Sequence, residues 1–239
     1  MKLKNKKVLV TGGAIRIGRS LCIMFANQGA KVVIHYNSSS LEAKQLLTEL
    51  GGHEQGHQLT KGDLTSQSYL NNLIPSLGKI DILINNASIF DNKPLAIENI
   101  AFSKYQYDIN FWVPLSLMKQ FKEQNSKDGL IINILDQRIY STCSESGSYL
   151  LSKKSLADAT RLGALQWAPE IRVNGIAPGI VIPPSTLSKS KMQKSIESTP
   201  LKRTTQLKEI SNACIFLAEN DSITGEIITI DGGRSLLNL

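Results

Sequence analysis

Seven short apolar runs alternate along this chain with amphipathic stretches, and each run is bounded by turn-forming residues. This order is typical of successive βαβ units, in which a crossover helix connects two parallel strands. Two of the amphipathic stretches, 41–50 and 209–219, repeat apolar residues every three or four positions, as helices do. The sequence therefore predicts an α/β fold with a parallel sheet, whose strands are expected at 6–10, 31–36, 56–60, 81–85, 130–135, 171–177 and 226–230.

The length and composition agree with one soluble domain. A chain of 239 residues with 41% hydrophobic and 20% charged residues can bury a sizeable core in a single α/β domain, here 1–239. No apolar run approaches the roughly 18 to 20 residues of a membrane span. The apolar run after the basic segment 1–7 is too short for a signal peptide. We therefore expect a cytoplasmic protein that does not bind membranes.

The residues that commonly bind metals or nucleic acids form no recognisable site. The net charge is +7, but the 27 basic residues are spread along the chain without a nucleic-acid recognition motif, so we expect them to attract an anionic cofactor. The cysteines form no Cys-x-x-Cys pair and the histidines lack ligand-like neighbours, so we expect buried cysteines, no disulfide framework and no metal. These residues are Cys22, Cys143, Cys214, His35, His53 and His57.

A glycine-containing turn, VLVTGGAIRIGRS at 8–20, lies between the first predicted strand and an apolar helical stretch. Backbone N–H groups at such a helix N-terminus can bind a pyrophosphate, and a second strand follows about twenty residues later, as a dinucleotide-binding unit requires. We therefore interpret the turn as a dinucleotide site rather than as a purely structural turn.

A second group of chemically active residues lies between 134 and 153. Tyr149 and Lys153 are four residues apart, which places them on one face of a helix and makes Tyr149 a candidate proton donor. Thirteen residues before Tyr149, where a hydroxyl would help to reduce a carbonyl, the chain has Asp136. A carboxylate there would oppose the negative charge that develops on oxygen in ketone reduction, so it favours a different hydride acceptor.

Taken together, these motifs resemble those of the short-chain dehydrogenase/reductases. The matching residues, in the order of that family, are Thr11, Gly12 and Gly18 of a TGxxxGxG turn, NNAS at 85–88, Asn110, Tyr149, Lys153, and IAPG at 176–179. The resemblance spans the whole chain. It implies one Rossmann-like domain with a doubly wound, seven-stranded parallel sheet, usually assembled into homotetramers.

Three departures from the family pattern are similar to pteridine reductases, which reduce dihydropterins and related rings with NADPH. Arg16 replaces the middle glycine of the turn, NNAS replaces NNAG and is followed by Phe90, and Asp136 precedes the tyrosine. The segments 199–203 and 231–236 also resemble bacterial members of this subgroup.

The end of the second predicted strand indicates the cofactor. An NAD-specific site would place a carboxylate there to bind the ribose hydroxyls, whereas this chain has HYNSSS at 35–40. His35, Ser38 and Ser39 can donate hydrogen bonds to a 2′-phosphate, so NADPH is favoured. Arg16 can reach both a cofactor phosphate and the substrate. The cofactor-binding residues that the resemblance implies are Thr11, Gly12, Arg16, Ile17, Gly18, His35, Tyr36, Ser38, Ser39, Asp63, Leu64, Asn86, Ala87, Ser88, Tyr149, Lys153, Pro178 and Gly179.

The resemblance also implies how the catalytic residues act. Tyr149 is expected to donate a proton, with Lys153 lowering its pKa from the ordinary value near 10 and anchoring the nicotinamide ribose. Asn110 is expected to hold a water beside that lysine, unless it is a polar residue of a helix interior. Phe90 is expected to stack a planar ring against the cofactor, and Ser88 to bind the pterin or a phosphate, unless Phe90 is an edge of the core.

Asp136 is expected to supply or relay a proton to a ring nitrogen, with a pKa raised by burial. The alternative is that Asp136 caps a strand end or pairs with Arg138. Asp63 resembles the family residue beside the adenine, with a helix cap or turn as its alternative. The expected catalytic residues are Asp136, Tyr149, Lys153 and Asn110, and the expected substrate contacts are Arg16, Ser88, Phe90, Asp136 and Tyr149.

The leading functional hypothesis is an NADPH-dependent reductase of pterins such as dihydromonapterin or dihydrobiopterin, and of dihydrofolate. One rival is a carbonyl reductase of the same fold, acting on a 3-oxoacyl thioester or a steroid-like ketone. Another is a catalytically silent NADPH-binding regulatory protein. The polar stretch 183–205 is expected to be either a mobile flap over the site or a plain surface connection.

Overall fold

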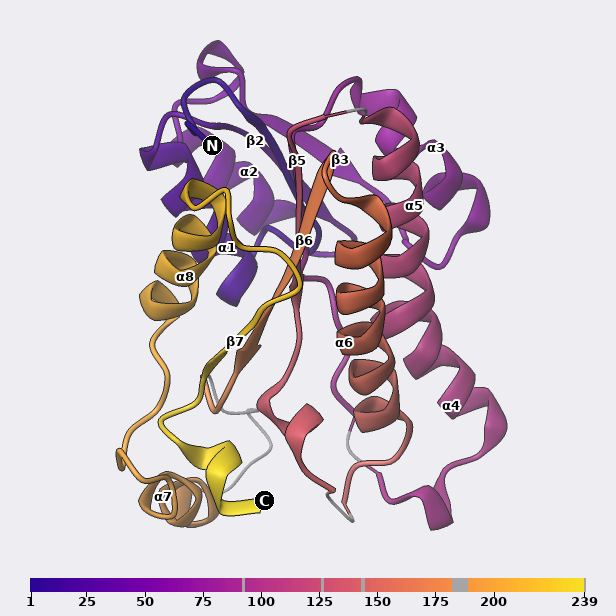
Figure 1. Cartoon of the computed structure of the whole chain (residues 1–239), viewed down its shortest axis with the longest axis vertical. Coiled ribbons are helices and arrows are strands. Elements are labelled where there is room, and N and C mark those ends of the chain that lie inside the picture. The colour runs from indigo at the N-terminus through magenta and orange to yellow at the C-terminus, as the bar shows by residue number, and fades with distance from the viewer. Residues whose placement is uncertain (92, 126, 143–144, 182–188, 239) are drawn as a thin grey trace.

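The chain forms one sheet of seven parallel strands in the order β3-β2-β1-β4-β5-β6-β7, seen in the computed structural model in Figure 1. The structure describes residues 1–91, 93–125, 127–142, 145–181 and 189–238. All seven predicted strands are confirmed, to within two residues at either end. Their bounds are β1 Lys7–Val10, β2 Lys31–Tyr36, β3 Gln58–Lys61, β4 Ile82–Asn85, β5 Gly129–Ile134, β6 Ile171–Pro178 and β7 Ile227–Ile230.

Helices cover both faces of this sheet because successive side chains of a strand point to opposite sides. Val8 and Val10 of β1 belong to the same buried cluster as Phe25, whereas Leu9 lies in a second buried cluster with Phe121. The first cluster joins the sheet to α1, α2 and α8, and the second joins it to α3, α5 and α6 (Figure 1). The helices are α1 Arg16–Asn27, α2 Ser40–Glu49, α3 Gln67–Leu77, α4 Ile100–Tyr107, α5 Val113–Gln124, α6 Ser148–Trp167, α7 Lys189–Glu197 and α8 Leu207–Glu219.

Short helices occupy several of the connections. They are the 3₁₀ helices η1 His53–Gln55, η2 Leu95–Ile97, η4 Gln137–Tyr140 and η5 Arg234–Asn238, and the π-helix η3 Asp108–Trp112 between α4 and α5. Within the stretch 183–205, residues 183–188 lie outside the described residues, and α7 occupies 189–197. After α7 the chain returns to the sheet edge, where the N–H of Thr205 donates to the carbonyl of Ile180 at 2.8 Å.

Cys22 and Cys214 are buried free thiols, as expected, while Cys143 lies outside the described residues. Within the described ranges, no three His, Cys, Asp or Glu side chains are grouped closely enough to hold a metal ion. A search of the same residues finds no helix with both the length and the apolar character needed to cross a membrane.

Candidate active site

Three of the predicted site segments meet at one edge of the sheet. Parallel strands bring their carboxyl ends to the same edge, and ligands in such folds bind where the strand order reverses. Here the reversal lies between β1 and β4, which are neighbours in the sheet. The glycine turn follows β1, the segment 86–88 follows β4, and Asp136 follows β5.

The glycine turn has the geometry of a phosphate-binding loop. Gly12 has a φ of +61°, and a Cβ on Gly18 would collide with the carbonyl of Gly12, so both positions need glycine. The first turn of α1 begins at Arg16, and the N-cap residue Ile15 offers no side-chain acceptor to its N–H groups. These N–H groups at a helix N-terminus fit an anionic phosphate.

Thr11 and Asn86 fasten this turn to the segment after β4. The hydroxyl oxygen of Thr11 accepts hydrogen bonds from the N–H groups of Asn86 at 2.9 Å and Ala87 at 3.0 Å. The side-chain amide of Asn86 donates in return to the carbonyls of Thr11 at 2.8 Å and Gly12 at 3.1 Å. The predicted residues are thus brought together. The Thr11 side chain is buried and acts by shaping the loop.

The catalytic candidates also meet. The Tyr149 hydroxyl donates to Oδ2 of Asp136 at 2.9 Å, across the gap between α6 and the end of β5. Oδ1 of Asp136 accepts from the backbone N–H of Arg138 at 2.8 Å and so caps η4. The buried Lys153 ammonium donates to the carbonyl of Ile134 at 2.9 Å. The alternative was a strand-end cap or a pair with Arg138; Asp136 instead caps the helix η4 through the Arg138 backbone and contacts the tyrosine as well.

Phe90 lies at the mouth of this cluster. It is 45% exposed, which excludes the alternative that it is an edge of the core. Its ring meets the ring of Tyr149 edge to face, with centroids 4.8 Å apart. The guanidinium carbon of Arg138 lies 5.1 Å from the Phe90 centroid. An exposed aromatic face beside a candidate proton donor can receive a flat ring.

Comparison with known proteins agrees with this geometry. A family model described as enoyl-(acyl carrier protein) reductase matches residues 13–235. The 7alpha-hydroxysteroid dehydrogenase of Escherichia coli K12 is 30% identical over 247 residues, covering 98% of this chain and 95% of that protein. This chain is a short-chain dehydrogenase/reductase. It is accordingly an oxidoreductase.

Two solved structures are similar to this short-chain dehydrogenase/reductase over almost its full length. FolM alternative dihydrofolate reductase 1 from Brucella suis, in complex with NADP, superposes with a TM-score of 0.92 at 33% identity, covering 99% of this chain and 97% of that one. The Brucella canis protein of the same name, also complexed with NADP, gives a TM-score of 0.91 at 32% identity, with coverages of 98% and 96%.

The pKa values in this short-chain dehydrogenase/reductase correct one expectation. The pKa of Tyr149 is raised well above 10, first by burial and then by the charge and hydrogen bond of Asp136, while the Arg138 cation opposes the shift. Lys153 is not among the groups that move it. Burial lowers the pKa of Lys153 itself to about 8. Tyr149 therefore keeps its proton at neutral pH.

His35 does not fit its expected contact with a 2′-phosphate. The ring is buried, and its Nδ1 accepts from the N–H of Gly12 at 3.2 Å. The proton must then be on Nε2, which lies 3.1 Å from the carbonyl of Gly62 and donates to it. Burial also lowers the pKa of His35 to about 4, so the ring is neutral. His35 instead supports the glycine turn from below.

The other residues predicted near the adenosine end differ in accessibility. Ser38 is exposed, and Ser39 is the N-cap of α2 without using its side chain to cap it, so both hydroxyls can face a ligand. Tyr36 and Leu64 are buried. The Asp63 carboxylate accepts from the N–H and hydroxyl of Thr65 at 2.9 and 2.8 Å, which matches the alternative that it forms a turn.

Asn110 is buried in the π-helix η3, and π-turns often occur at functional sites. Its side-chain oxygen accepts from the hydroxyl of Ser88 at 2.8 Å and the N–H of Ile89 at 3.0 Å. Its amide donates to the carbonyl of Ile89 at 3.0 Å and to Gln106 at 3.1 Å. The side chain therefore holds the 88–89 segment in place. The Ser88 hydroxyl is already donated to Asn110.

Glu98 is a site residue that the sequence did not reveal. Both of its carboxylate oxygens lie 3.0 Å from the N–H of Ser148, so Glu98 supplies the N-terminal cap of α6, the helix that carries Tyr149 and Lys153. A hydroxyl bond from Ser103 at 3.0 Å orients it. The cap comes from 50 residues earlier in the chain, and no local pattern could have shown it.

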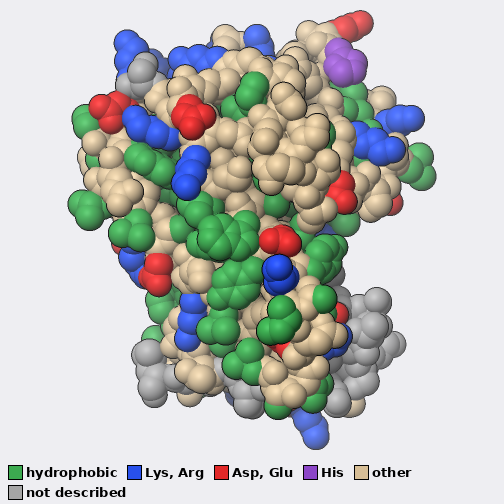
Figure 2. All heavy atoms as spheres, turned by 90° about the vertical axis from the view of Figure 1, so that its right-hand side faces the viewer, with side chains coloured by type: hydrophobic (Ala, Val, Ile, Leu, Met, Phe, Trp, Pro, Cys, Tyr) green, Lys and Arg blue, Asp and Glu red, His purple; other side chains and the backbone are tan. Residues whose placement is uncertain are grey.

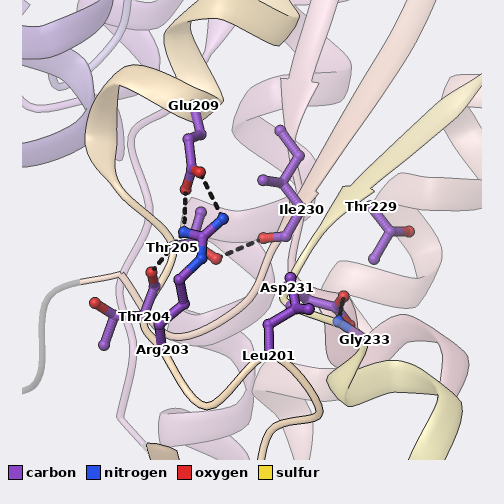
Figure 3. A pocket seen from close by; sticks show the side chains of 10 residues that line it. Leu201, Arg203, Thr204, Thr205, Glu209, Thr229, Ile230, Asp231 and Gly233 are labelled. Atoms are coloured by element: carbon purple, nitrogen blue, oxygen red, sulfur yellow. Dashed lines mark hydrogen bonds and ion pairs between the residues drawn. The ribbon is translucent and has the colours of Figure 1, made fainter.

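Pro178 is the last residue of β6, beside β7, and Gly179 follows it. The N–H of Gly179 donates to the carbonyl of Ile230 at 2.9 Å, and a Cβ at Gly179 would lie 2.6 Å from Cα of Asp231. The cavity of about 300 Å³ shown in Figure 3 is lined by Ile230 and Asp231 together with residues 201 and 203–205. Its Arg203 and Glu209 side chains are paired with each other at 2.9 and 3.1 Å. This cavity contains neither Tyr149 nor the glycine turn.

Proposed function

We propose that this short-chain dehydrogenase/reductase is an NADPH-dependent pteridine reductase. It converts dihydropterins such as dihydromonapterin or dihydrobiopterin, and dihydrofolate, to their tetrahydro forms. The hydrogen bond from Tyr149 to Asp136, 2.9 Å long, is the observation that carries the proposal. A carboxylate in contact with the proton donor disfavours an oxyanion and suits an acceptor whose charge develops on nitrogen.

Reduction of a ring C=N bond adds a hydride to carbon and a proton to nitrogen. NADPH, when bound, supplies the hydride and becomes NADP⁺. Tyr149 is protonated at neutral pH because burial and Asp136 raise its pKa. Its hydroxyl can turn from Asp136 to the substrate nitrogen, and the half-buried Asp136 can return a proton from solvent to the tyrosine. The two side chains thus form a short proton relay.

The cofactor assignment is supported by the glycine turn, with its N–H groups at the start of α1, and by the segment that follows β2. No carboxylate follows β2 in the segment 37–40 to repel a 2′-phosphate, and the Ser38 and Ser39 hydroxyls and the N-terminus of α2 lie there. Arg16 adds a cation at the start of α1. Both FolM structures that superpose on this chain contain NADP.

We further propose a single domain over 1–239 that assembles into a cytoplasmic homotetramer. One sheet and two buried clusters span the described residues. Figure 2 turns to the viewer the side of the molecule on which α3, α4 and α5 lie in Figure 1, and it shows apolar side chains among scattered charges. The face formed by α4, η3 and α6 has exposed apolar side chains. Its exposed members include Tyr105, Trp112, Leu162 and Leu165. Such a surface is suited to bury itself against another copy.

A carbonyl reductase is the second candidate, because the 30% identical relative is a hydroxysteroid dehydrogenase and the Tyr149–Lys153 pair is intact. A catalytically silent NADPH-binding regulatory protein is the third. The deciding experiment is NADPH oxidation with dihydrobiopterin, dihydromonapterin, dihydrofolate, acetoacetyl thioester and a steroid ketone. A pterin or folate should give the highest kcat/KM, and NADPH should be used more efficiently than NADH.

A clear lead for the thioester or the steroid ketone would replace the pteridine reductase with the carbonyl reductase. NADPH binding without turnover of any substrate would favour the regulatory protein. Equal or reversed efficiencies with NADPH and NADH would contradict the interpretation of the segment after β2. Tyr149→Phe is the control that shows whether any observed turnover arises at this site.

A further inference from the structure

Arg138 places a guanidinium at the candidate site that the proposed reaction does not use. Its backbone N–H is committed to capping by Asp136, but its side chain makes no ion pair or hydrogen bond with another residue that the structure describes. The guanidinium instead lies over the ring of Phe90, at 5.1 Å from the centroid. Arg138 itself is half-buried.

Phe90 lies between this guanidinium and Tyr149, since its ring contacts both side chains. The Phe90 ring meets the Tyr149 ring at 4.8 Å, and it is 45% exposed. Arg138 therefore stands one side chain away from Tyr149, beside the exposed Phe90 ring. A pterin that contacts both Tyr149 and the exposed Phe90 ring would lie within one side chain of the Arg138 guanidinium.

A cation over an exposed aromatic ring is held weakly, so the guanidinium is available to a better partner. The partner that its planar fork of donors fits best is a carboxylate, which it can bind through two parallel hydrogen bonds. The Asp136 carboxylate does not fill this role, because its two oxygens bind Tyr149 and the Arg138 backbone.

We propose that Arg138 is a specificity-determining residue that binds a carboxylate on the side chain of the substrate. On this basis the enzyme discriminates in favour of dihydrofolate and related carboxylated pterins over pterins with a neutral side chain. The inference rests on the proposed pteridine reductase function. It adds to that function the class of substrate that the site prefers.

The test compares kcat/KM for dihydrofolate, dihydropteroate and dihydrobiopterin in the parent enzyme and in Arg138→Met, Arg138→Lys and Arg161→Met. Dihydrofolate carries glutamate and no free benzoate carboxylate, dihydropteroate carries the benzoate alone, and dihydrobiopterin carries neither. Arg161 is the matched control, since it is an exposed arginine of α6 that pairs with Asp158 at 3.4 Å, away from the site. NADPH affinity and thermal unfolding show whether each variant is folded.

In Arg138→Met, the ratio of kcat/KM for dihydrofolate to that for dihydrobiopterin should fall by roughly tenfold to a hundredfold, the size of one charge-assisted hydrogen-bonded contact. The loss should appear mainly in KM for dihydrofolate. Arg138→Lys should have a ratio between those of Arg138→Met and the parent, because lysine keeps the positive charge but not the two parallel N–H donors of the guanidinium. Arg161→Met should leave the ratio as in the parent. The behaviour of dihydropteroate shows which carboxylate is bound.

In a folded Arg138→Met, an equal fold loss of kcat/KM for dihydrofolate and dihydrobiopterin would overturn the inference, and so would no loss for either substrate. Both results leave the pteridine reductase function standing, because the parent enzyme still reduces dihydrobiopterin. If the parent enzyme reduced none of the three pterins, both the proposed function and the inference would be refuted. Added salt should raise KM for dihydrofolate more in the parent than in Arg138→Met, since salt screens the ionic contact.

Discussion

Replacing Asp136 tests the proposed chemistry most directly, because this carboxylate performs two separable tasks. Oδ2 accepts the Tyr149 hydroxyl at 2.9 Å, and Oδ1 accepts the Arg138 N–H at 2.8 Å. Asp136→Ala removes both hydrogen bonds. Asp136→Asn retains an oxygen that can cap η4 but cannot take up or release a proton near neutral pH. Comparing the two variants separates the relay from the cap.

The size of each effect follows from the hydrogen bond that the variant removes. Loss of a helix cap costs about 1 kcal/mol. In a protein of this size that lowers Tm by about 2–4 °C, which we expect for Asp136→Ala and not for Asp136→Asn. Loss of the relay should lower pterin turnover at least about tenfold in both variants, less than the roughly hundredfold to ten-thousandfold of a direct proton donor, because Tyr149 remains. Asp136→Ser should not restore it, because serine is a poor proton source.

The pH dependence gives a third readout. The charge and hydrogen bond of Asp136 both raise the pKa of Tyr149. In Asp136→Ala this pKa should fall, so that Tyr149 loses its proton at a lower pH than in the parent. The alkaline limb of the kcat profile should therefore shift to lower pH in the variant. NADPH affinity should change little, since Asp136 is not part of the glycine turn.

The assay is steady-state NADPH oxidation with dihydrobiopterin across the working pH range, with fluorescence titration of NADPH and thermal unfolding on the same samples. Full pterin activity in Asp136→Asn or Asp136→Ala at every pH would make the carboxylate incidental and favour the carbonyl reductase. An activity loss that merely parallels a large fall in Tm would assign Asp136 to the cap alone.

Three further predictions concern the groups around this pair. Tyr149→Phe keeps the ring and removes the proton, so turnover should fall by roughly a hundredfold to ten-thousandfold with NADPH affinity nearly unchanged, and a near-normal rate would remove Tyr149 from the mechanism. His35 is neutral in the fold with a pKa lowered to about 4. Between about pH 6.5 and 4 the unfolded chain therefore binds more protons, and the free energy of unfolding should fall by roughly 3 kcal/mol as the pH drops through this window. Urea unfolding should show a weaker pH dependence in His35→Asn, and an identical dependence would contradict the assignment. Glu98→Ala should lower Tm by about 2–4 °C and reduce kcat, because α6 loses its cap. Glu98→Gln should keep Tm and kcat close to those of the parent. Equal behaviour of the two variants would exclude a capping role.

The fold was accessible from the sequence because its determinants are local. Each strand is a short apolar run between turn residues, and the alternation with amphipathic helices leaves a parallel sheet as the solution. The glycine turn is equally local, since Gly12 and Gly18 are required by backbone geometry within one loop. The four-residue spacing of Tyr149 and Lys153 is enough to place them on one helix face.

The tertiary structure decided which polar groups are available. His35 has the sequence position of a phosphate donor, yet burial and its two hydrogen bonds turn it into a support for the glycine turn. The pKa of Tyr149 depends on burial and on a carboxylate brought from another element, and its shift is opposite in sign to the effect expected from the neighbouring lysine. Desolvation and through-space charge are properties of the packed molecule, so residue spacing does not determine them.

Glu98 and Arg138 show the same division. The cap on α6 joins Glu98 to Ser148, 50 positions later in the chain. The guanidinium of Arg138, which follows β5, lies over the exposed ring of Phe90, which follows β4. The sequence by itself determined the sheet, the glycine turn and the placement of Tyr149 and Lys153 on one helix, because these depend on neighbours along the chain. Only the tertiary structure decided that Asp136 accepts the Tyr149 hydroxyl, that Glu98 caps α6 and that Arg138 lies over Phe90, because these interactions arise where separate elements meet.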